Sequence, residues 1–208
     1  VINDLNRDVA TLFRILQRHY RAFRMTIEWQ LTTRADFERL TCIDPDTLTD
    51  LERAARFLYL QRTAFGGKPS GRNFGVSVGS PGRFDLAKLG PMLEDVHARL
   101  SGGIIECLSY GDFITRYDRA GTLFYVDPPY WGGESDYGKG MFAREDFARL
   151  ANLLQGLQGR FVMSINDRPE IRDMFGWADI KAVQTTYSVS AGAVSKPAAE
   201  LIITKRPA

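Results

Sequence analysis

The chain has 208 residues, of which 44% are hydrophobic, and a formal net charge of +2. This length suits one core-forming domain, or one domain with an insertion, and the balanced charge means that any affinity for nucleic acid must depend on where the basic residues lie. No apolar run approaches the ~20 residues of a membrane span and no signal-peptide pattern is present, so we expect a cytoplasmic protein without membrane contact. We also expect a monomer. Cys42 and Cys107 lack metal-ligand spacing, which predicts no metal site and two reduced, structural thiols.

The N-terminal part of the chain is predicted to be helical. Apolar residues recur at helical spacing over 8–23, with Asn6 as the N-cap. A second helix is expected from the capping box formed by Thr49 and Glu52 to about Thr63. The polar face of the first helix carries Arg7, Arg14, Arg18 and Arg21. These arginines either contact DNA phosphate or are simply solvated.

The stretch from Gln61 to Phe84 is rich in glycine and basic residues and contains no Asp or Glu. Aromatic residues interleaved with cations are typical of a hairpin that follows a phosphate backbone and presses an apolar side chain against bases. The alternative is a flexible glycine loop with coincidental charge. The residues expected to contact DNA are Arg62, Phe65, Lys68, Arg72 and Asn73.

The remaining chain alternates helices and strands, which predicts an α/β fold. Helices are expected over 86–100, 112–117 and 144–155, and strands over 103–108, 122–126 and 160–165. Asp167 is expected to cap a further helix with Pro169 in its first turn. Two last strands, over 179–189 and 198–205, are expected to form an antiparallel hairpin.

The apolar run over 122–126 leads into the tetrapeptide Asp127-Pro128-Pro129-Tyr130. Two prolines cannot donate ladder hydrogen bonds, so the strand must end there, at the edge where open α/β sheets bind ligands. The four residues suit methyl transfer to an exocyclic amine. Asp127 and the Pro128 carbonyl can each accept an N–H hydrogen bond that strengthens as positive charge builds on nitrogen, and Tyr130 offers a face for an extruded base. The alternative is a simple turn followed by a core tyrosine.

The chain resembles the DNA N6-adenine methyltransferases of the α group, which include orphan adenine methylases of bacteria and phages. The resemblance rests on several short segments and on the order in which they follow one another along the chain. The tetrapeptide and Asn3-Asp4-Leu5-Asn6 are its more specific motifs. The other matching segments are 56–62, 109–113, 161–167 and 200–203. The resemblance implies a Rossmann-like S-adenosylmethionine-dependent methyltransferase sheet with a reversed final strand. It also implies a catalytic domain over 1–24 and 101–208, with a mostly helical target-recognition insertion, carrying the basic hairpin, over 25–100.

The resemblance also implies a binding site for S-adenosyl-L-methionine. Asp4 is expected to bind the ribose hydroxyls, Asp112 and Phe113 the cofactor adenine, and Asp127 to border the same site. The alternative role for Asp4 and Asp112 is helix capping. The family's glycine-rich turn lies about 20 residues before the Asn-Asp-Leu-Asn acid, so we expect it upstream of Val1 and expect the 208 residues alone to bind the cofactor weakly.

The loop Trp131–Phe142 has four glycines and three large aromatic residues, which favours a lid over the extruded base, or else a plain loop. The sequence as a whole predicts methylation of the adenine N6 amino group in double-stranded DNA. Cytosine N4 methylation uses the same geometry, but its enzymes usually carry Ser in place of Asp127. A DNA-binding protein without catalysis is the second alternative.

Overall fold

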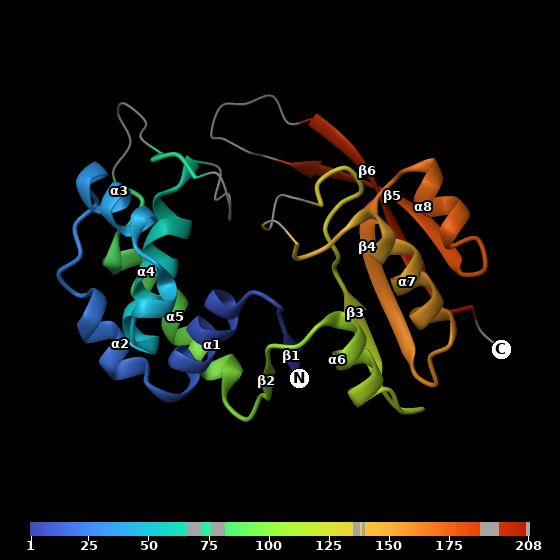
Figure 1. Ribbon diagram of the computed structural model, residues 1–208, viewed down its shortest axis with the longest axis horizontal. Coiled ribbons are helices and arrows are strands. Elements are labelled where there is room, and N and C mark those ends of the chain that lie inside the picture. Colours follow the sequence, from blue (N-terminus) through green and yellow to red (C-terminus); the bar gives the residue numbers. More distant parts are fainter. Residues whose placement is uncertain (66–71, 76–81, 135–137, 139, 188–195, 207–208) are drawn as a thin grey trace. The chain divides into compact units, whose positions relative to one another are not determined.

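A computed structural model describes residues 1–65, 72–75, 82–134, 138, 140–187 and 196–206 of the chain (Figure 1). The chain divides into two units, Val1–Ser109 and Tyr110–Ala208. Each unit has a buried apolar cluster of its own. Each is therefore held together by its own core. No helix among the described residues has the length and apolar character needed to cross a membrane.

The first unit contains a short parallel pair of strands, β1 (Ile2–Asn3) and β2 (Ile105–Glu106). The Asn3 side chain extends this pairing, because its Nδ2 donates to the Leu108 carbonyl at 3.1 Å and its Oδ1 accepts from the Leu108 N–H at 2.9 Å. β2 is shorter than the strand predicted over 103–108. Among the described residues, Ile2 and Asn3 are the ones that pair with it, and Leu108 bonds to the Asn3 side chain rather than to a strand backbone.

Two helices follow, α1 (Arg7–Arg18) and α2 (Tyr20–Ile27), and the prediction of one helix over 8–23 is wrong at His19. His19 has φ −127° and ψ 29°, which is not helical. Apolar residues continue on both sides of the break, so periodicity does not reveal it. Asn6 is the N-cap as predicted, with its Oδ1 2.9 Å from the Asp8 backbone nitrogen.

The helix α4 (Asp50–Thr63) is central to the core of the first unit. It begins at the predicted capping box of Thr49 and Glu52, and it packs against α1, α2 and α3 (Arg34–Cys42). A short 3-10 helix, η1 (Pro45–Thr47), precedes it. The helix α5 (Leu86–Leu100) has the predicted bounds and packs against α1 and α2.

A buried guanidinium ties α4 to its neighbours. Arg53, 6% exposed, has its Nε 2.5 Å from Asp8 Oδ1 in α1 and its Nη1 2.6 Å from Asp46 Oδ1 in η1. Arg56 is also buried and donates from its Nε to the Leu40 carbonyl at 2.7 Å. A buried charge needs such partners, so these contacts hold α1, α3 and η1 in place against α4.

The second unit is built on a four-stranded mixed sheet in the order β3-β4-β6-β5. Its strands are β3 (Leu123–Val126), β4 (Arg160–Asn166), β5 (Asp179–Tyr187) and β6 (Lys196–Thr204). β3 and β4 are parallel, whereas β6 is antiparallel to both β4 and β5. The predicted hairpin of the last two strands is therefore confirmed, and the fold is a mixed α/β fold with a mixed sheet.

One face of this sheet forms the core of the second unit. In β4, Phe161, Met163 and Ile165 are buried, while the alternate residues Ser164 and Asn166 are only partly buried. The buried side chains share a cluster with residues of the helix α7 (Arg144–Gln155), which has the predicted bounds. Figure 1 shows α7 alongside β4. Because side chains alternate along a strand, Ser164 and Asn166 lie on the face opposite this core.

Two short helices differ from the prediction in detail. α6 (Tyr110–Tyr117) begins two residues before the predicted start, which places Asp112 in its first turn. α8 (Pro169–Met174) has Pro169 in its first turn as predicted, but Arg168 is its N-cap, so the capping role predicted for Asp167 is wrong. Asp167 instead accepts two 2.7 Å hydrogen bonds from the Arg172 guanidinium. Two charge-assisted hydrogen bonds to a guanidinium are stronger than the hydrogen bond that a capping carboxylate accepts from a backbone N–H.

Candidate active site

The tetrapeptide Asp127-Pro128-Pro129-Tyr130 begins where β3 ends, as predicted. β3 pairs with β4 as far as Val126, which lies opposite Met163. Pro128 is buried and Pro129 partly buried, whereas Asp127 is exposed. The two prolines therefore pack against the rest of the protein and restrict the turn. The Asp127 carboxylate stays at the surface, next to the carboxyl end of β3.

A chain of hydroxyl groups orients the Asp127 carboxylate. Ser164 Oγ donates to Asp127 Oδ1 at 3.2 Å, and Tyr125 Oη lies 3.1 Å from the same Ser164 oxygen. A serine hydroxyl has one proton, so Tyr125 must donate to Ser164 while Ser164 donates to Asp127. Asp127 is exposed, and its Oδ2 has no hydrogen-bond partner among the described residues.

Two further contacts hold the residues after the prolines. The Tyr130 hydroxyl donates to Glu200 Oε1 on β6, and the Tyr130 ring is partly buried. Asn166, the last residue of β4, accepts from the Trp131 N–H at 2.9 Å and donates to the Trp131 carbonyl at 3.0 Å. The backbone of Trp131 and the tip of Tyr130 are thus both attached to the sheet.

The start of the predicted lid is anchored by an aromatic and ionic cluster. The Arg144 guanidinium lies 4.1 Å from the Trp131 ring centroid, and the Phe147 ring centroid lies 5.0 Å from it. Arg144 also pairs with Glu134 at 2.7 Å. Partial burial raises the pKa of Glu134, but hydrogen bonds from its own backbone and from the Gly132 N–H, with the Arg144 charge, hold that pKa below its ordinary value. Lid motion remains a prediction, and residues 135–137 and 139 of this loop lie outside the described part.

The residues predicted to meet the cofactor adenine both lie on α6. Asp112 is exposed, and Phe113 is partly buried against Tyr117 and Phe124, with ring centroids 5.0 and 6.1 Å away. Phe113 thus contributes to the core of the second unit with part of its ring. The rest of its surface and the Asp112 carboxylate remain candidates for cofactor contact.

Asp4, the predicted ribose acid, directly follows β1 in the first unit, as expected for a residue at a strand end. Its Oδ1 accepts from the Asn6 N–H at 2.7 Å. Burial raises the pKa of Asp4 above its ordinary value, and the hydrogen bond from Asn6 only partly offsets this. A carboxylate held this way keeps its second oxygen for a ligand, although the local contact with Asn6 also serves the start of α1.

The described part of the basic stretch includes the paired base of a hairpin. Ala64 and Phe74 form an antiparallel bridge, and the Phe65 N–H donates to the Asn73 carbonyl at 2.8 Å. Phe74 turns inward, 5.4 Å from the Phe37 ring, whereas Phe65 is 53% exposed. Of the two aromatic residues, Phe65 is therefore the more exposed, and its contact with DNA stays a prediction.

The cations predicted to contact DNA differ in their surroundings. Arg72 is partly buried, with its guanidinium 5.9 Å from the Phe57 ring centroid. Burial, and then the nearby Arg56 charge, lower the pKa of Arg72. Asn73 is exposed beside Phe65 at the hairpin base, and Lys68 lies outside the described residues.

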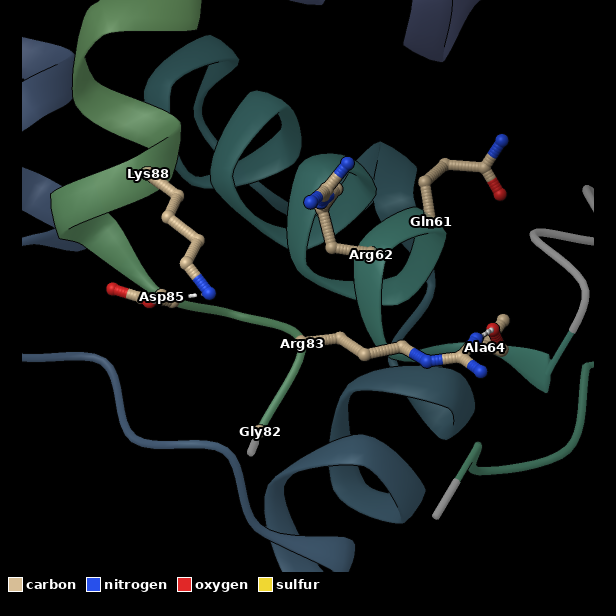
Figure 2. A pocket seen from close by; sticks show the side chains of 7 residues that line it. All are labelled: Gln61, Arg62, Ala64, Gly82, Arg83, Asp85 and Lys88. Carbon is tan, nitrogen blue, oxygen red and sulfur yellow. Dashed lines mark hydrogen bonds and ion pairs between the residues drawn. The ribbon is translucent and has the colours of Figure 1, made fainter. Parts of the chain in front are cut away.

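Arg62 lines a cavity of about 380 Å³ at the foot of this hairpin, shown in Figure 2. Arg83 extends across it to the Ala64 carbonyl, 3.3 Å away, and Lys88 points toward Asp85 at 3.7 Å. Arg62 Nε is buried without a hydrogen-bond partner among the described residues. Three cations and one carboxylate give the cavity a positive balance, which suits an anionic group such as phosphate.

Neither cysteine is part of a cluster. Cys42 and Cys107 are free and exposed, so the prediction that they are structural thiols is wrong, although their lack of pairing agrees with it. Within the described ranges, no group of three or more His, Cys, Asp or Glu side chains is placed to hold a metal ion.

Comparison with known proteins identifies the family. Residues 1–189 match the model of the D12 class N6 adenine-specific DNA methyltransferases. The chain belongs to this family. It is 28% identical over 231 aligned positions to the type II methyltransferase M1.LlaDCHI of Lactococcus lactis subsp. cremoris, covering 98% of the chain and 78% of that protein. It is 28% identical over 133 residues to the type II methyltransferase M.CviBI of Paramecium bursaria Chlorella virus NC1A, covering 63% of the chain and 50% of that protein. The match thus spans only half the length of the viral relative.

Four residues at the candidate site were not predicted from the sequence: Tyr125, Ser164, Asn166 and Glu200. Ser164 and Asn166 alternate with buried apolar residues in β4, and this alternation places both on the polar face of the strand. Their partners lie 35 or more positions away in sequence, so the alternation alone does not indicate what they contact.

Proposed function

We propose that the protein transfers a methyl group from S-adenosyl-L-methionine to the N6 amino group of an adenine rotated out of double-stranded DNA. The observation that carries the proposal is the Asp127 carboxylate. It is exposed at the end of β3, one oxygen is oriented by Ser164, and the other has no partner among the described residues. Membership of the adenine-specific family supports the choice of acceptor.

Asp127 and the carbonyl of Pro128 would accept the two N–H groups of the adenine amine. The lone pair of this nitrogen is delocalised into the ring, and two acceptors on one side favour the pyramidal form needed for attack. Both hydrogen bonds strengthen as the N–C bond forms and nitrogen becomes positive, so they stabilise the transition state more than the ground state. A carboxylate is too weak a base to deprotonate the neutral amine, so the proton leaves after methyl transfer.

Tyr130 would provide the stacking face for the extruded base. An adenine that leaves the duplex loses its stacking neighbours, and an aromatic ring in the pocket replaces part of that energy. The Tyr130 ring is partly exposed and follows Asp127 by three residues in the chain, and its hydroxyl is held by Glu200. A base stacked on this ring would have its amino group near the acceptors of the same tetrapeptide.

The described residues fit the cofactor in their chemistry. Asp112 offers an exposed carboxylate for an adenine amino group and Phe113 a partly exposed aromatic edge beside it. Asp4 offers a carboxylate at a strand end, where ribose hydroxyls are bound in comparable folds. When bound, S-adenosyl-L-methionine supplies a methyl group on a positively charged sulfur, and it leaves as S-adenosyl-L-homocysteine.

DNA contact is assigned to the hairpin region of the first unit. Phe65 is exposed for contact with bases, and Asn73 lies beside it. The cavity lined by Arg62, Arg83 and Lys88 suits a backbone phosphate. Arg72, which packs on Phe57, would then contribute more through the local field than by direct contact.

The test is methyl transfer by the full-length protein carrying Asp127→Ala. The substitution removes one transition-state acceptor at the surface and no core volume, so labelled methyl transfer to DNA should be lost while the circular dichroism spectrum stays the same. Asp173→Ala, an exposed aspartate of α8, is the matched control and should keep wild-type activity. Wild-type activity in Asp127→Ala would show that another group accepts the amine.

A further inference from the structure

Two residues that lie opposite each other on neighbouring antiparallel strands both hold the segment after the double proline. Asn166 of β4 lies directly opposite Glu200 of β6 in the strand register. Directly opposite residues of an antiparallel pair project from the same face of the sheet. From this face, Glu200 reaches the Tyr130 hydroxyl and Asn166 reaches the Trp131 backbone.

The contact of Asn166 fixes a peptide unit rather than a side chain. Its Oδ1 lies 2.9 Å from the Trp131 nitrogen, and its Nδ2 lies 3.0 Å from the Trp131 oxygen. The Asn166 side chain thus bonds to both the backbone N–H and the backbone C=O of Trp131, as the backbone of a neighbouring strand does in a sheet. The chain beyond the prolines therefore leaves the sheet in one orientation.

The contact of Glu200 fixes the remaining freedom of Tyr130. Pro129 restricts the backbone before the tyrosine, and Asn166 restrains the residue after it. The side chain still has two rotatable bonds. A hydrogen bond from its hydroxyl to Glu200 Oε1 fixes the position of the hydroxyl oxygen and so restrains the first of these bonds. Rotation of the ring about its long axis leaves that oxygen in place, but a phenolic O–H prefers the plane of its ring, so the same hydrogen bond favours ring orientations that keep Glu200 near that plane.

We propose that Asn166 and Glu200 are positioning residues that set the plane of the Tyr130 ring for the target base. The inference rests on the proposed function, in which this ring stacks on the extruded adenine. Neither residue needs to touch the base or the methyl group. Both lie on the polar side of β4 and β6, away from the core residues Met163, Ile165 and Leu201, so replacing them removes little core packing.

Amide hydrogen exchange tests the Asn166 contact without any measurement of activity. The two prolines carry no amide hydrogen, so a peptide covering 127–133 reports on few amides. In Asn166→Ala, the Trp131 amide should exchange at least about tenfold faster than in the wild type, because its acceptor is lost. Asn152→Ala, an exposed asparagine of α7, is the matched control and should leave this peptide unchanged. Unchanged exchange in Asn166→Ala would overturn the positioning role.

A double-mutant cycle tests the Glu200 contact. Glu200→Ala and Tyr130→Phe should each lower the single-turnover rate of methyl transfer by about tenfold to a hundredfold, as expected for a misplaced reactant. The double mutant should be no slower than the slower single mutant, because both substitutions break the same hydrogen bond. Glu200→Gln keeps an acceptor for the hydroxyl and should restore most of the rate. Fluorescence of 2-aminopurine at the target position should show less base stacking on the protein in the two slow single mutants.

Multiplied rate losses in the double mutant would overturn the proposal, because Glu200 would then act independently of the Tyr130 hydroxyl. Loss of activity in Glu200→Gln equal to that in Glu200→Ala would do the same. If the wild-type protein methylates no adenine, while Asn166→Ala still exposes the Trp131 amide, the proposed function is wrong and the attachment of the loop by Asn166 is confirmed.

Discussion

Ser164 Oγ lies 3.2 Å from Asp127 Oδ1 and donates to it, while Tyr125 supplies the hydroxyl proton that satisfies Ser164. The carboxylate is therefore held by a neighbouring strand rather than by its own loop. One oxygen is oriented by this hydrogen bond, and the other has no hydrogen-bond partner among the described residues.

Loss of this contact should slow catalysis without destabilising the fold. Ser164→Ala should lower kcat by about tenfold, which corresponds to losing one hydrogen bond to a charged acceptor, and leave KM for DNA nearly unchanged. Steady-state kinetics on a duplex containing the target site measure both. Thr185→Ala on β5 is a control for loss of a small hydroxyl residue elsewhere in the same sheet. A wild-type kcat in Ser164→Ala would mean that Asp127 needs no support from β4.

The cavity shown in Figure 2 should contribute to the salt dependence of DNA binding. Neutralising both Arg83 and Lys88 with glutamine should flatten the dependence of log affinity on log salt by up to about two slope units, if both meet phosphates. Fluorescence anisotropy over a range of salt concentrations gives the slope. The control replaces Arg39 and Arg99, exposed arginines already paired with acids of their own helices. An equal change of slope in this control would mean that the cavity makes no specific contribution.

Phe65 should act differently from the cations. It is exposed at the hairpin base and carries no charge, so Phe65→Ala should weaken binding or base extrusion and leave the salt slope unchanged. The same anisotropy series, with 2-aminopurine fluorescence for extrusion, separates the two effects. Phe74→Ala is not a suitable control, because Phe74 packs against Phe37. If Phe65→Ala alters neither affinity nor extrusion, the recognition surface lies elsewhere, and the arginine face of α1 is the next candidate.

The ion pairs around Arg53 should matter for stability rather than for catalysis. Asp8→Asn leaves the buried Arg53 guanidinium without one of its two carboxylates and should lower the free energy of unfolding by about 3 kcal/mol. Asp50→Asn breaks the exposed pair with Arg14 and should cost less than about 1 kcal/mol. Urea denaturation compares the two. Equal losses would indicate that the buried pair is no more stabilising than a surface one.

Features that depend on residues close together in the chain could be predicted from the sequence, and contacts between residues far apart in the chain could not. The capping box of Thr49 and Glu52, the ends of α7 and the exit of β3 into two prolines depend on residues close together in the chain, so composition and spacing reveal them. The break at His19 leaves apolar spacing intact on both sides, and periodicity cannot detect it.

The supports of the candidate site depend on strand register. Asn166 meets Trp131 across 35 positions, and Glu200 meets Tyr130 across 70 positions. These contacts follow from the pairing of β4 with β3 on one side and with β6 on the other. A shift of one residue in either pairing would turn these side chains to the opposite face of the sheet, so their partners cannot be inferred before the register is known.

The central claim is most directly tested by identifying the methylated nucleoside. Unmethylated duplex DNA is incubated with the full-length protein and S-adenosyl-L-methionine, then digested to nucleosides and analysed by mass spectrometry, with Asp127→Ala in parallel. We predict N6-methyladenine from the wild-type protein and none from Asp127→Ala. N4-methylcytosine as the only product, or equal N6-methyladenine from both proteins, would contradict the assignment of Asp127 as the acceptor for the adenine amine.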